Sequence, residues 1–373
     1  MQRQARMLEL LQELVNIDSD SYNKTGVDQV GKRMIEAYKG IGFKATLLPQ
    51  KEYGNHIVLR DDAAINPSIL VLAHMDTVFP KGTTATRPFS TEGDYAFGPG
   101  VADMKGSLVT TLFAMERLVE RNEEARKEVE ILLTSDEEIG APSARSFIEA
   151  HVKGKKAVLV MEPARKDGSL VTFRRGGGRY TLKVYGVAAH SGNEPEKGAS
   201  AIEEMAHKTI GLHGLSNKEI GIQINVGMIK GGVAVNTIAD YAEAEIDVRI
   251  STKEQALEVD QAITQLCQTT VVPGTSIKLE GGLTRPPMER NQETVALFSQ
   301  IKTIGQKLQL NITEASSGGG SDASFASALG VPTIDGMGPI GAGFHGQDEY
   351  LELSSLESRS DLLYETIKSL VQA

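Results

Sequence analysis

The chain has 373 residues, of which 40% are hydrophobic and 24% are charged, so it is a globular chain long enough for two domains with separate cores. Its net charge of −10 and its lack of a long basic run argue against nucleic acid or an anionic membrane as the partner. The sequence contains no run of 18 apolar residues that would predict a membrane span, and its first 20 residues lack the apolar core of a signal peptide. Because Cys267 is the single cysteine, an internal disulfide is excluded. We therefore expect a cytoplasmic protein.

The sequence up to residue 175 alternates helices with strands. We predict two amphipathic helices within residues 1–40, followed by strands at 44–48 and 56–59. The apolar run at 68–73 is typical of a strand buried on both faces, as in a mostly parallel sheet covered by helices. The same reasoning predicts strands at 129–133, 157–161 and 331–334, and helices at about 105–121, 293–308 and 354–371.

Residues 176–286 follow a different pattern. Their predicted strands alternate apolar and polar side chains, as half-exposed antiparallel strands do. The strands are expected at 180–185, 220–228, 241–250 and 276–279, with helices at about 199–212 and 253–270. This order is β-α-β-β-α-β, a four-stranded antiparallel sheet with two helices on one face. We therefore predict an α/β domain of residues 1–175 and 287–373, with a second, α+β domain inserted at 176–286.

Potential metal ligands follow the buried strands at their carboxyl ends. Strand by strand, these residues are His74 with Asp76, Glu137 with Glu138, Glu162 and, after a glycine-rich loop, His345. Because parallel strands end at the same edge of a sheet, we expect these side chains to meet. Asp103, in a glycine-flanked turn before a helix, is a further candidate. Imidazole nitrogen and carboxylate oxygen are both ligands that zinc accepts, so the pattern predicts a metal site.

Each of these residues also has a plainer interpretation. His74 could be a buried histidine bonded to an acid, Asp103 a helix N-cap, and Glu137 with Glu138 a solvated pair. Taken together, five candidate ligands suit two metal ions better than one: His74, Asp103, Glu138, Glu162 and His345. Only one of the two adjacent glutamates need bind metal, and the other is free to act as a base. Asp76 is placed to orient His74.

The motifs HMDTV, GPGVADMKG, TSDEEIG, MEP, AHSG, GGGSDAS and FHG, in this order, resemble those of the metallopeptidase 20 family of di-zinc aminoacyl hydrolases. Within that family the chain is most similar to bacterial glutamate carboxypeptidases of the folate-hydrolysing, carboxypeptidase G type. The resemblance implies that His74, Asp103 and Glu162 hold one zinc and that Asp103, Glu138 and His345 hold the other. It also implies Glu137 as general base, Asp76 as the partner of His74, and a cis peptide bond between Asp103 and Met104.

The resemblance further implies roles for the inserted domain as lid and dimerisation domain. His190 matches a histidine that binds the developing oxyanion, often from the partner subunit, whereas by sequence alone it is a turn histidine. Asn236 and Arg249 match lid positions that contact substrate, and a surface salt bridge is the alternative for Arg249. Arg285 matches an arginine associated with recognising an acidic side chain. Gly319 lies in a loop before a short helix, which suits either a substrate carboxylate or a structural turn.

The expected function is hydrolysis of an amide bond by two Zn²⁺ ions, with Co²⁺ or Mn²⁺ as alternatives, to release a C-terminal amino acid from a small peptide or N-acyl amino acid. Glutamate is a candidate, although Ser316 and Ser317 stand where the glutamate carboxypeptidases have an arginine, and Leu170 where they have a lysine. The alternatives are an N-acyl amino acid deacylase, a dipeptidase or, from another class, a non-catalytic binding protein. The exposed sheet edge of the insert favours a homodimer.

Overall fold

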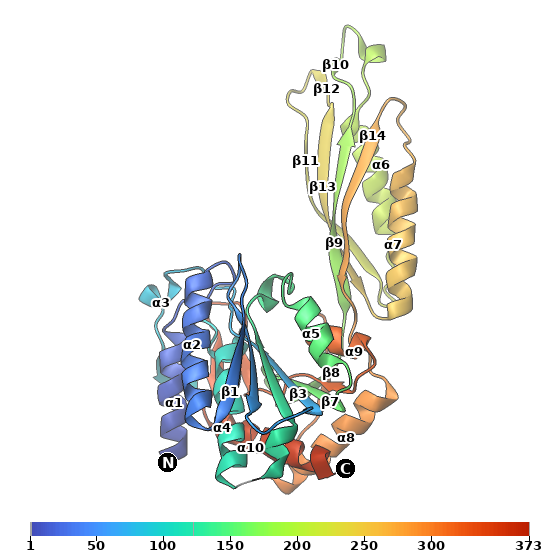
Figure 1. Ribbon diagram of the computed structural model, residues 1–373. Helices are drawn as coiled ribbons and strands as arrows, with labels where there is room; N and C mark the ends of the chain where they lie inside the picture. The colour runs from blue at the N-terminus through green and yellow to red at the C-terminus, as the bar shows by residue number, and fades with distance from the viewer. Residues whose placement is uncertain (1, 122, 373) are drawn as a thin grey trace. The chain divides into compact units, whose positions relative to one another are not determined.

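The computed structural model describes residues 2–121 and 123–372, which form two compact units (Figure 1). Unit 1 comprises Met1–Phe173, Arg290–Ser317 and Ser321–Ala373. Unit 2 comprises Arg174–Glu289 and Gly318–Gly320. In the described residues no helix combines the length and the apolar character needed to span a bilayer.

Unit 1 is built on a six-stranded sheet with the order β1-β2-β6-β3-β7-β16. Its strands are β1 (Phe43–Leu48), β2 (His56–Asp61), β3 (Ile69–His74), β6 (Val129–Thr134), β7 (Ala157–Val160) and β16 (Thr333–Ile334). The last four are mutually parallel, β2 pairs antiparallel with β6, and β1 pairs antiparallel with β2. The predicted fold class, an α/β unit with a mostly parallel sheet, is therefore confirmed.

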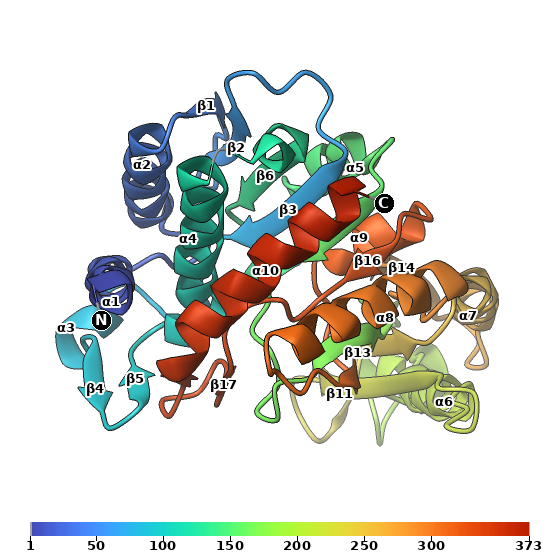
Figure 2. The same ribbon diagram turned by 90° about the horizontal axis from the view of Figure 1, so that it is seen from below.

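Helices cover both faces of this sheet because its strands are apolar on both faces. Ile69, Val71 and Ala73 of β3 join the large core, whereas Leu70 and Leu72 point to the opposite face. The helices of the large core are α1 (Gln2–Val15), α2 (Lys24–Gly40), α4 (Gly106–Glu120), α8 (Gln292–Lys307) and α10 (Ser354–Gln372), with α4 and α10 packed side by side (Figure 2). On the other face α5 (Arg145–Val152), which was not predicted, packs on α9 (Ala323–Ala328).

A second, small sheet in unit 1 was not predicted. It has the order β17-β18-β5-β4, with β4 (Ser90–Glu92), β5 (Tyr95–Phe97), β17 (Gly341–Ala342) and β18 (Tyr350–Glu352). Residues 81–100 contain β4, β5 and the one-turn helix α3 (Thr83–Thr86). Because β5 pairs with β18, the segment before Asp103 lies beside the segment that carries His345.

The remaining short elements are β8 (Leu170–Arg174) paired with β15 (Glu314–Ser317), the 3₁₀ turns at Glu124–Glu128 and Glu137–Ile139, and a π-helical turn at Val101–Lys105.

Unit 2 has the β-α-β-β-α-β order that the sequence predicted. Its antiparallel sheet, β11-β13-β9-β14, is made of β9 (Gly176–Tyr185), β11 (Gln223–Gly231), β13 (Tyr241–Ile250) and β14 (Ser276–Arg285). Helices α6 (Ala201–Gly214) and α7 (Lys253–Gln268) lie on one face (Figure 1). They begin at the N-caps Ser200 and Thr252, the latter in a capping box, and bury Cys267 in the core between helices and sheet.

Unit 2 also contains three shorter elements. The strands β10 (Ala189–His190) and β12 (Thr237–Ile238) pair with each other, and a 3₁₀ turn spans Pro195–Lys197. The strand β14 runs six residues beyond its predicted end at 279, because its pairing with β9 continues past Gly281 and Gly282.

Candidate metal centre and active site

The carboxyl edge of the parallel strands brings the candidate ligands together. His74 is the last residue of β3, and Glu162 lies two residues beyond β7, the strand beside it. Glu138 lies in the turn that follows β6, the neighbour of β3 on its other side. Neighbouring strands therefore place three candidate ligands from distant parts of the chain at one edge of the sheet.

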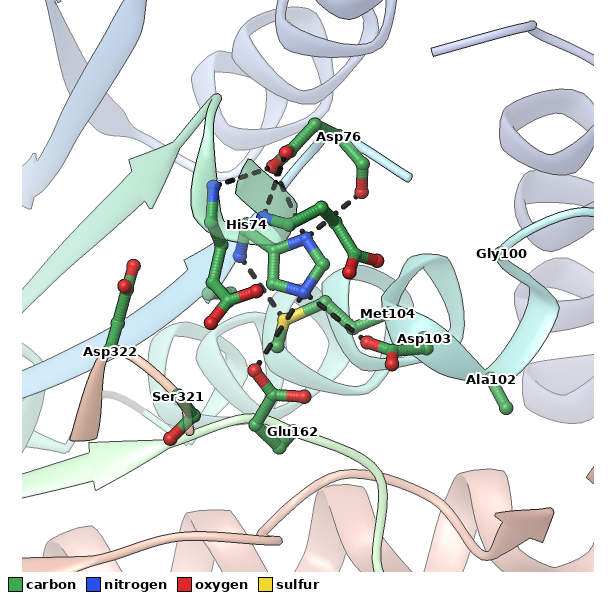
Figure 3. A network of polar contacts seen from close by, with 12 residues as sticks. His74, Asp76, Gly100, Ala102, Asp103, Met104, Glu162, Ser321 and Asp322 are labelled. Carbon is green, nitrogen blue, oxygen red and sulfur yellow. Dashed lines mark hydrogen bonds and ion pairs between the residues drawn. The ribbon is translucent and has the colours of Figure 1, made fainter. Parts of the chain in front are cut away.

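These residues form two ligand groups that share Asp103. The first group is His74, Asp103 and Glu162, and the second is Asp103, Glu138 and His345. His74 Nε2 lies 3.3 Å from Asp103 Oδ1 and 3.7 Å from Glu162 Oε1 (Figure 3). His345 Nε2 lies 3.4 Å from Asp103 Oδ2 and 3.2 Å from Glu138 Oε2. Each oxygen of the Asp103 carboxylate thus faces a different group, the arrangement of a bridging ligand.

The orientation of the His74 ring suits a metal ligand. Nδ1 lies 2.9 Å from the backbone carbonyl oxygen of Asp76, to which it donates, so in the neutral ring Nε2 carries the lone pair. Within the described residues, His74 Nε2, Asp103 Oδ1 and Glu138 Oε1 are buried and have no hydrogen-bond partner. Buried polar atoms without partners are costly, and cations held by the two ligand groups would offset that cost. The donor set therefore fits divalent metal ions.

The charges of the site lead to the same conclusion. Burial and the Asp103 carboxylate raise the pKa of Glu138 to about 8 and that of Glu162 well above its usual value. Burial alone would lower the pKa of His74, but the carboxylates of Asp103 and Asp76 raise it. Asp103 and Glu138 raise the pKa of His345 to about 11. Several carboxylates buried this closely require added positive charge, as protons or as metal ions.

Asp76 has more contacts than its predicted role required. Its Oδ1 accepts the backbone N–H of Glu137 and its Oδ2 accepts that of Glu138, both at 3.2 Å, and Oδ2 also accepts the hydroxyl of Ser21 at 2.6 Å. Burial opposes ionisation of Asp76, but His74 and Ser21 outweigh it and lower the pKa. Asp76 therefore holds the turn that carries Glu137 and Glu138 as well as contacting the His74 ring. The Glu137 side chain is largely buried beside these acids and contributes to the raised pKa of Glu162.

The backbone around Asp103 differs from an ordinary helix start. Asp103 lies inside the π-helical turn Val101–Lys105 rather than at an N-cap, with φ −111° and ψ 93°. Its peptide bond to Met104 is cis, as the resemblance implied. The Met104 sulfur accepts the backbone N–H of His74 at 3.1 Å, so the segments carrying two candidate ligands are in direct contact.

The candidate substrate residues of unit 2 fall into two places. His190 pairs with Thr237, and the backbone carbonyl of Asn236 accepts the N–H of Ser191 at 3.0 Å, so His190 and Asn236 are neighbours. Nδ1 of His190 accepts the backbone N–H groups of Gly192 and Asn193 at 3.1 and 3.2 Å. In the neutral ring the proton is therefore on Nε2.

The other place is the end of β14. A Cβ on Gly320 would lie 2.4 Å from Cδ of Arg285, so Arg285 packs against the loop that contains Gly319. The carbonyl oxygens of Gly319 and Gly320 accept from Arg174 at 3.3 Å. Arg249 instead makes a bidentate pair with Asp247 at 2.9 and 3.0 Å, which is the salt bridge considered for it.

Comparison with known proteins identifies the family. The model of peptidase family M20/M25/M40 matches residues 70–369, most of the chain. The chain belongs to this family. Carboxypeptidase G2 from Pseudomonas sp. (strain RS-16) is 28% identical over 95% of this chain and 87% of that protein. A succinyl-diaminopimelate desuccinylase from Hahella chejuensis is 27% identical over 98% of this chain and 97% of that protein.

Solved structures of M20 and related peptidases share the fold. Aminopeptidase PepT from Bacillus cereus superposes with a TM-score of 0.80 at 22% identity, covering 99% of both chains. The Bacillus subtilis YXEP protein, described as a dinuclear metal binding peptidase of the M20 family, has a TM-score of 0.73 at 16% identity and covers 100% of this chain and 99% of that one. The chain is thus an M20 family hydrolase, and metallopeptidases of this family bind metal ions.

Sequence reasoning missed several residues around the centre of this M20 hydrolase. Ser21 contacts Asp76, and the buried carboxylate of Glu349 accepts backbone N–H groups next to Asp103. His56 is buried, and its ring contacts serines on either side of the turn that carries Glu137 and Glu138: Nδ1 lies 3.1 Å from Ser135 Oγ and Nε2 lies 3.0 Å from Ser143 Oγ. A serine, one acid among several and a strand histidine carry no sequence signal of such contacts.

Proposed function

We propose that this M20 family member is a di-zinc carboxypeptidase or aminoacyl amidohydrolase. Its reaction is hydrolysis of an amide bond next to a free α-carboxylate, which releases a C-terminal amino acid from a small peptide or an N-acyl amino acid. The observation that carries this proposal is the pair of ligand groups that share Asp103, with Glu137 beside them. A centre for two ions next to a carboxylate base is the machinery of metal-assisted amide hydrolysis.

The proposed metal ligands are the two groups described above, with zinc favoured by their imidazole and carboxylate donors and Co²⁺ or Mn²⁺ as alternatives. When bound, such ions supply Lewis acidity, which lowers the pKa of a water molecule and polarises the substrate carbonyl. Asp76 keeps His74 in the tautomer whose Nε2 lone pair faces the site, and it holds the backbone of Glu137 and Glu138.

The general base in this proposal is Glu137. Its carboxylate takes a proton from the attacking water as the carbon–oxygen bond forms, and it returns that proton to the leaving nitrogen as the carbon–nitrogen bond breaks. The products are a carboxylate and a free amine. The turn Glu137–Ile139 supports this assignment, because Asp76 fixes both backbone N–H groups of the glutamate pair while only Glu138 belongs to a ligand group.

We further propose that His190 donates its Nε2 proton to the developing oxyanion. The two backbone N–H groups at Nδ1 support this role, since they leave the ring proton on the other nitrogen. Asn236, Arg285 and Gly319 are proposed to contact substrate, and Arg249 to do so only if it leaves Asp247. The insert at 176–286 is proposed as a lid and dimerisation domain, and the protein as a cytoplasmic homodimer.

The substrate proposal is a C-terminal glutamate or a related acidic amino acid. The similarity to carboxypeptidase G2 over 95% of the chain and the presence of Arg285 support it. A second candidate is deacylation of an N-acyl amino acid, because a relative named a desuccinylase matches over 98% of the chain. A dipeptidase and a non-catalytic binding protein are the remaining alternatives.

The deciding experiment is an assay of the zinc-loaded protein on N-acyl glutamates, other N-acyl amino acids and dipeptides. The proposal expects the highest kcat/KM on an acyl or peptidyl glutamate. Metal analysis that finds no stoichiometric zinc, cobalt or manganese after reconstitution would favour the binding protein instead.

The variant Glu137→Gln should keep both metals and lose at least about a hundredfold in kcat, as expected for a lost general base. Near wild-type turnover in that variant would contradict the assignment of the base.

A further inference from the structure

A buried carboxylate outside both ligand groups holds the backbone at Asp103. The Glu349 side chain is fully buried, and its Oε1 accepts the N–H groups of Ala102 at 2.9 Å and Asp103 at 3.0 Å. Its Oε2 accepts the N–H of Gly100 at 3.2 Å. Figure 3 shows Gly100, Ala102 and Asp103 on one segment beside His74 and Glu162.

These three N–H groups lie at the start of the π-helical turn Val101–Lys105, where backbone donors precede the first helical hydrogen bonds. The segment is also closely packed. Gly100 has a positive φ of 72°, and a Cβ there would lie 2.4 Å from Thr77 Cγ2. Because a buried amide without a partner is costly, the Glu349 carboxylate selects the one path of this segment that satisfies all three donors.

Glu349 also connects the segments of two candidate ligands. It lies four residues after His345 and immediately before β18, which pairs with β5 just ahead of Gly100. His345 belongs to the second ligand group and Asp103 to both. One side chain therefore fixes the position of Asp103 relative to the loop that supplies His345.

We infer that Glu349 is a positioning residue for the metal centre: it contacts no metal, and it raises metal affinity by holding Asp103 where its two oxygens face the two ligand groups. The inference rests on the proposed metal centre. Groups that orient metal ligands in this way typically change metal affinity by tenfold to a hundredfold when they are replaced. Because Asp103 is shared, both ions should bind more weakly.

The test is metal binding by Glu349→Gln and Glu349→Ala, with Glu352→Gln as the matched control on β18. Gln keeps an acceptor for Ala102 and Asp103 but presents an amide to the N–H of Gly100, so its effect should be smaller than that of Ala. Zn²⁺ affinity is measured by competition with a chromophoric chelator, using metal-free full-length protein in the oligomeric state that it adopts in solution. The visible spectrum of the Co²⁺ form reports ligand geometry. We expect a loss of about tenfold in affinity for Gln and up to about a hundredfold for Ala, with an altered Co²⁺ spectrum.

The outcomes separate this inference from the proposed function. If the wild-type protein binds no metal, the metal centre itself is wrong. If the wild-type protein binds two ions and Glu349→Gln binds them with the same affinity and the same Co²⁺ spectrum, the metal centre stands and the positioning role is wrong. A role in folding alone would lower the melting temperature of the metal-free variants and leave affinity and spectrum unchanged. If Glu349→Ala does not fold, Glu349→Gln still decides.

Discussion

The two ligand groups of the centre differ in how firmly the fold fixes them. The side chains of His74 and Glu162 are 2% and 9% exposed; His74 ends β3, and Glu162 follows the adjacent parallel strand β7. His345 is 54% exposed and lies on a loop, with a positive φ of 65°. A ligand at the end of a buried strand is held by the whole sheet, whereas a loop ligand depends on a few local contacts. The first group should therefore bind its ion more tightly than the second.

The largest expected effect comes from the residue that both groups share. Asp103→Asn keeps the size of the side chain but removes the negative charge from the bridging position. We expect both ions to be lost at micromolar metal and kcat to fall by at least about a thousandfold, which corresponds to about 4 kcal/mol of lost transition-state stabilisation. Metal content by mass spectrometry and steady-state kinetics measure the two effects. Retention of two tightly bound ions would contradict the bridging role.

The next effect compares the two histidines directly. His345→Ala should leave one ion bound and change the free energy of unfolding of the metal-free protein by no more than about 0.5 kcal/mol, because the ring is half exposed. His74→Ala should remove the ion of the first ligand group. It should also destabilise the metal-free protein by about 1–3 kcal/mol, because the ring is buried. Chemical unfolding in the presence of a chelator measures the second quantity. Equal destabilisation by the two variants would remove the proposed difference between the groups.

The last effect concerns stability rather than metal binding, at the turn that supplies Glu138 to the second group. Burial lowers the pKa of His56 to about 4, against 6.5 in the unfolded chain. Above pH 6.5 the ring is neutral in both states, so its titration costs no stability. As the pH falls from 6.5 to about 4, the unfolded chain binds the proton first, and stability decreases by up to roughly 3 kcal/mol.

This dependence can be isolated by comparison with a variant. His56→Gln in metal-free protein should show a flatter stability profile between pH 4 and 6.5 than the wild type, and His213→Gln, at an exposed helix end, should match the wild type. Urea unfolding at each pH gives the profile. Parallel profiles for wild type and His56→Gln would show that His56 does not titrate as stated.

Much of the framework could be predicted because its signals are local. Residues 69–73 are all apolar and 129–133 are apolar except for Glu130, as expected for strands covered on both faces, and polar residues that include histidine or acids follow each run. In residues 176–286 the alternation of side chains similarly predicted four antiparallel strands and two helices. The candidate ligands are visible for the same reason, since each directly follows such a segment or a glycine-rich turn.

The three-dimensional structure decided the contacts that hold those ligands. The three-residue strands β4, β5 and β18 are too short for a recognisable period: β4 pairs with its neighbour β5, and β5 pairs with β18 across about 250 residues of chain. In sequence, Glu349 is indistinguishable from Asp348 and Glu352, and Ser21 from any other serine. The sequence determined which atoms are available to bind metal, because each apolar strand and the polar residues that follow it are close together in the sequence. Only the tertiary structure decided which buried carboxylates and hydroxyls hold them in place, because those contacts join residues that are distant in the chain.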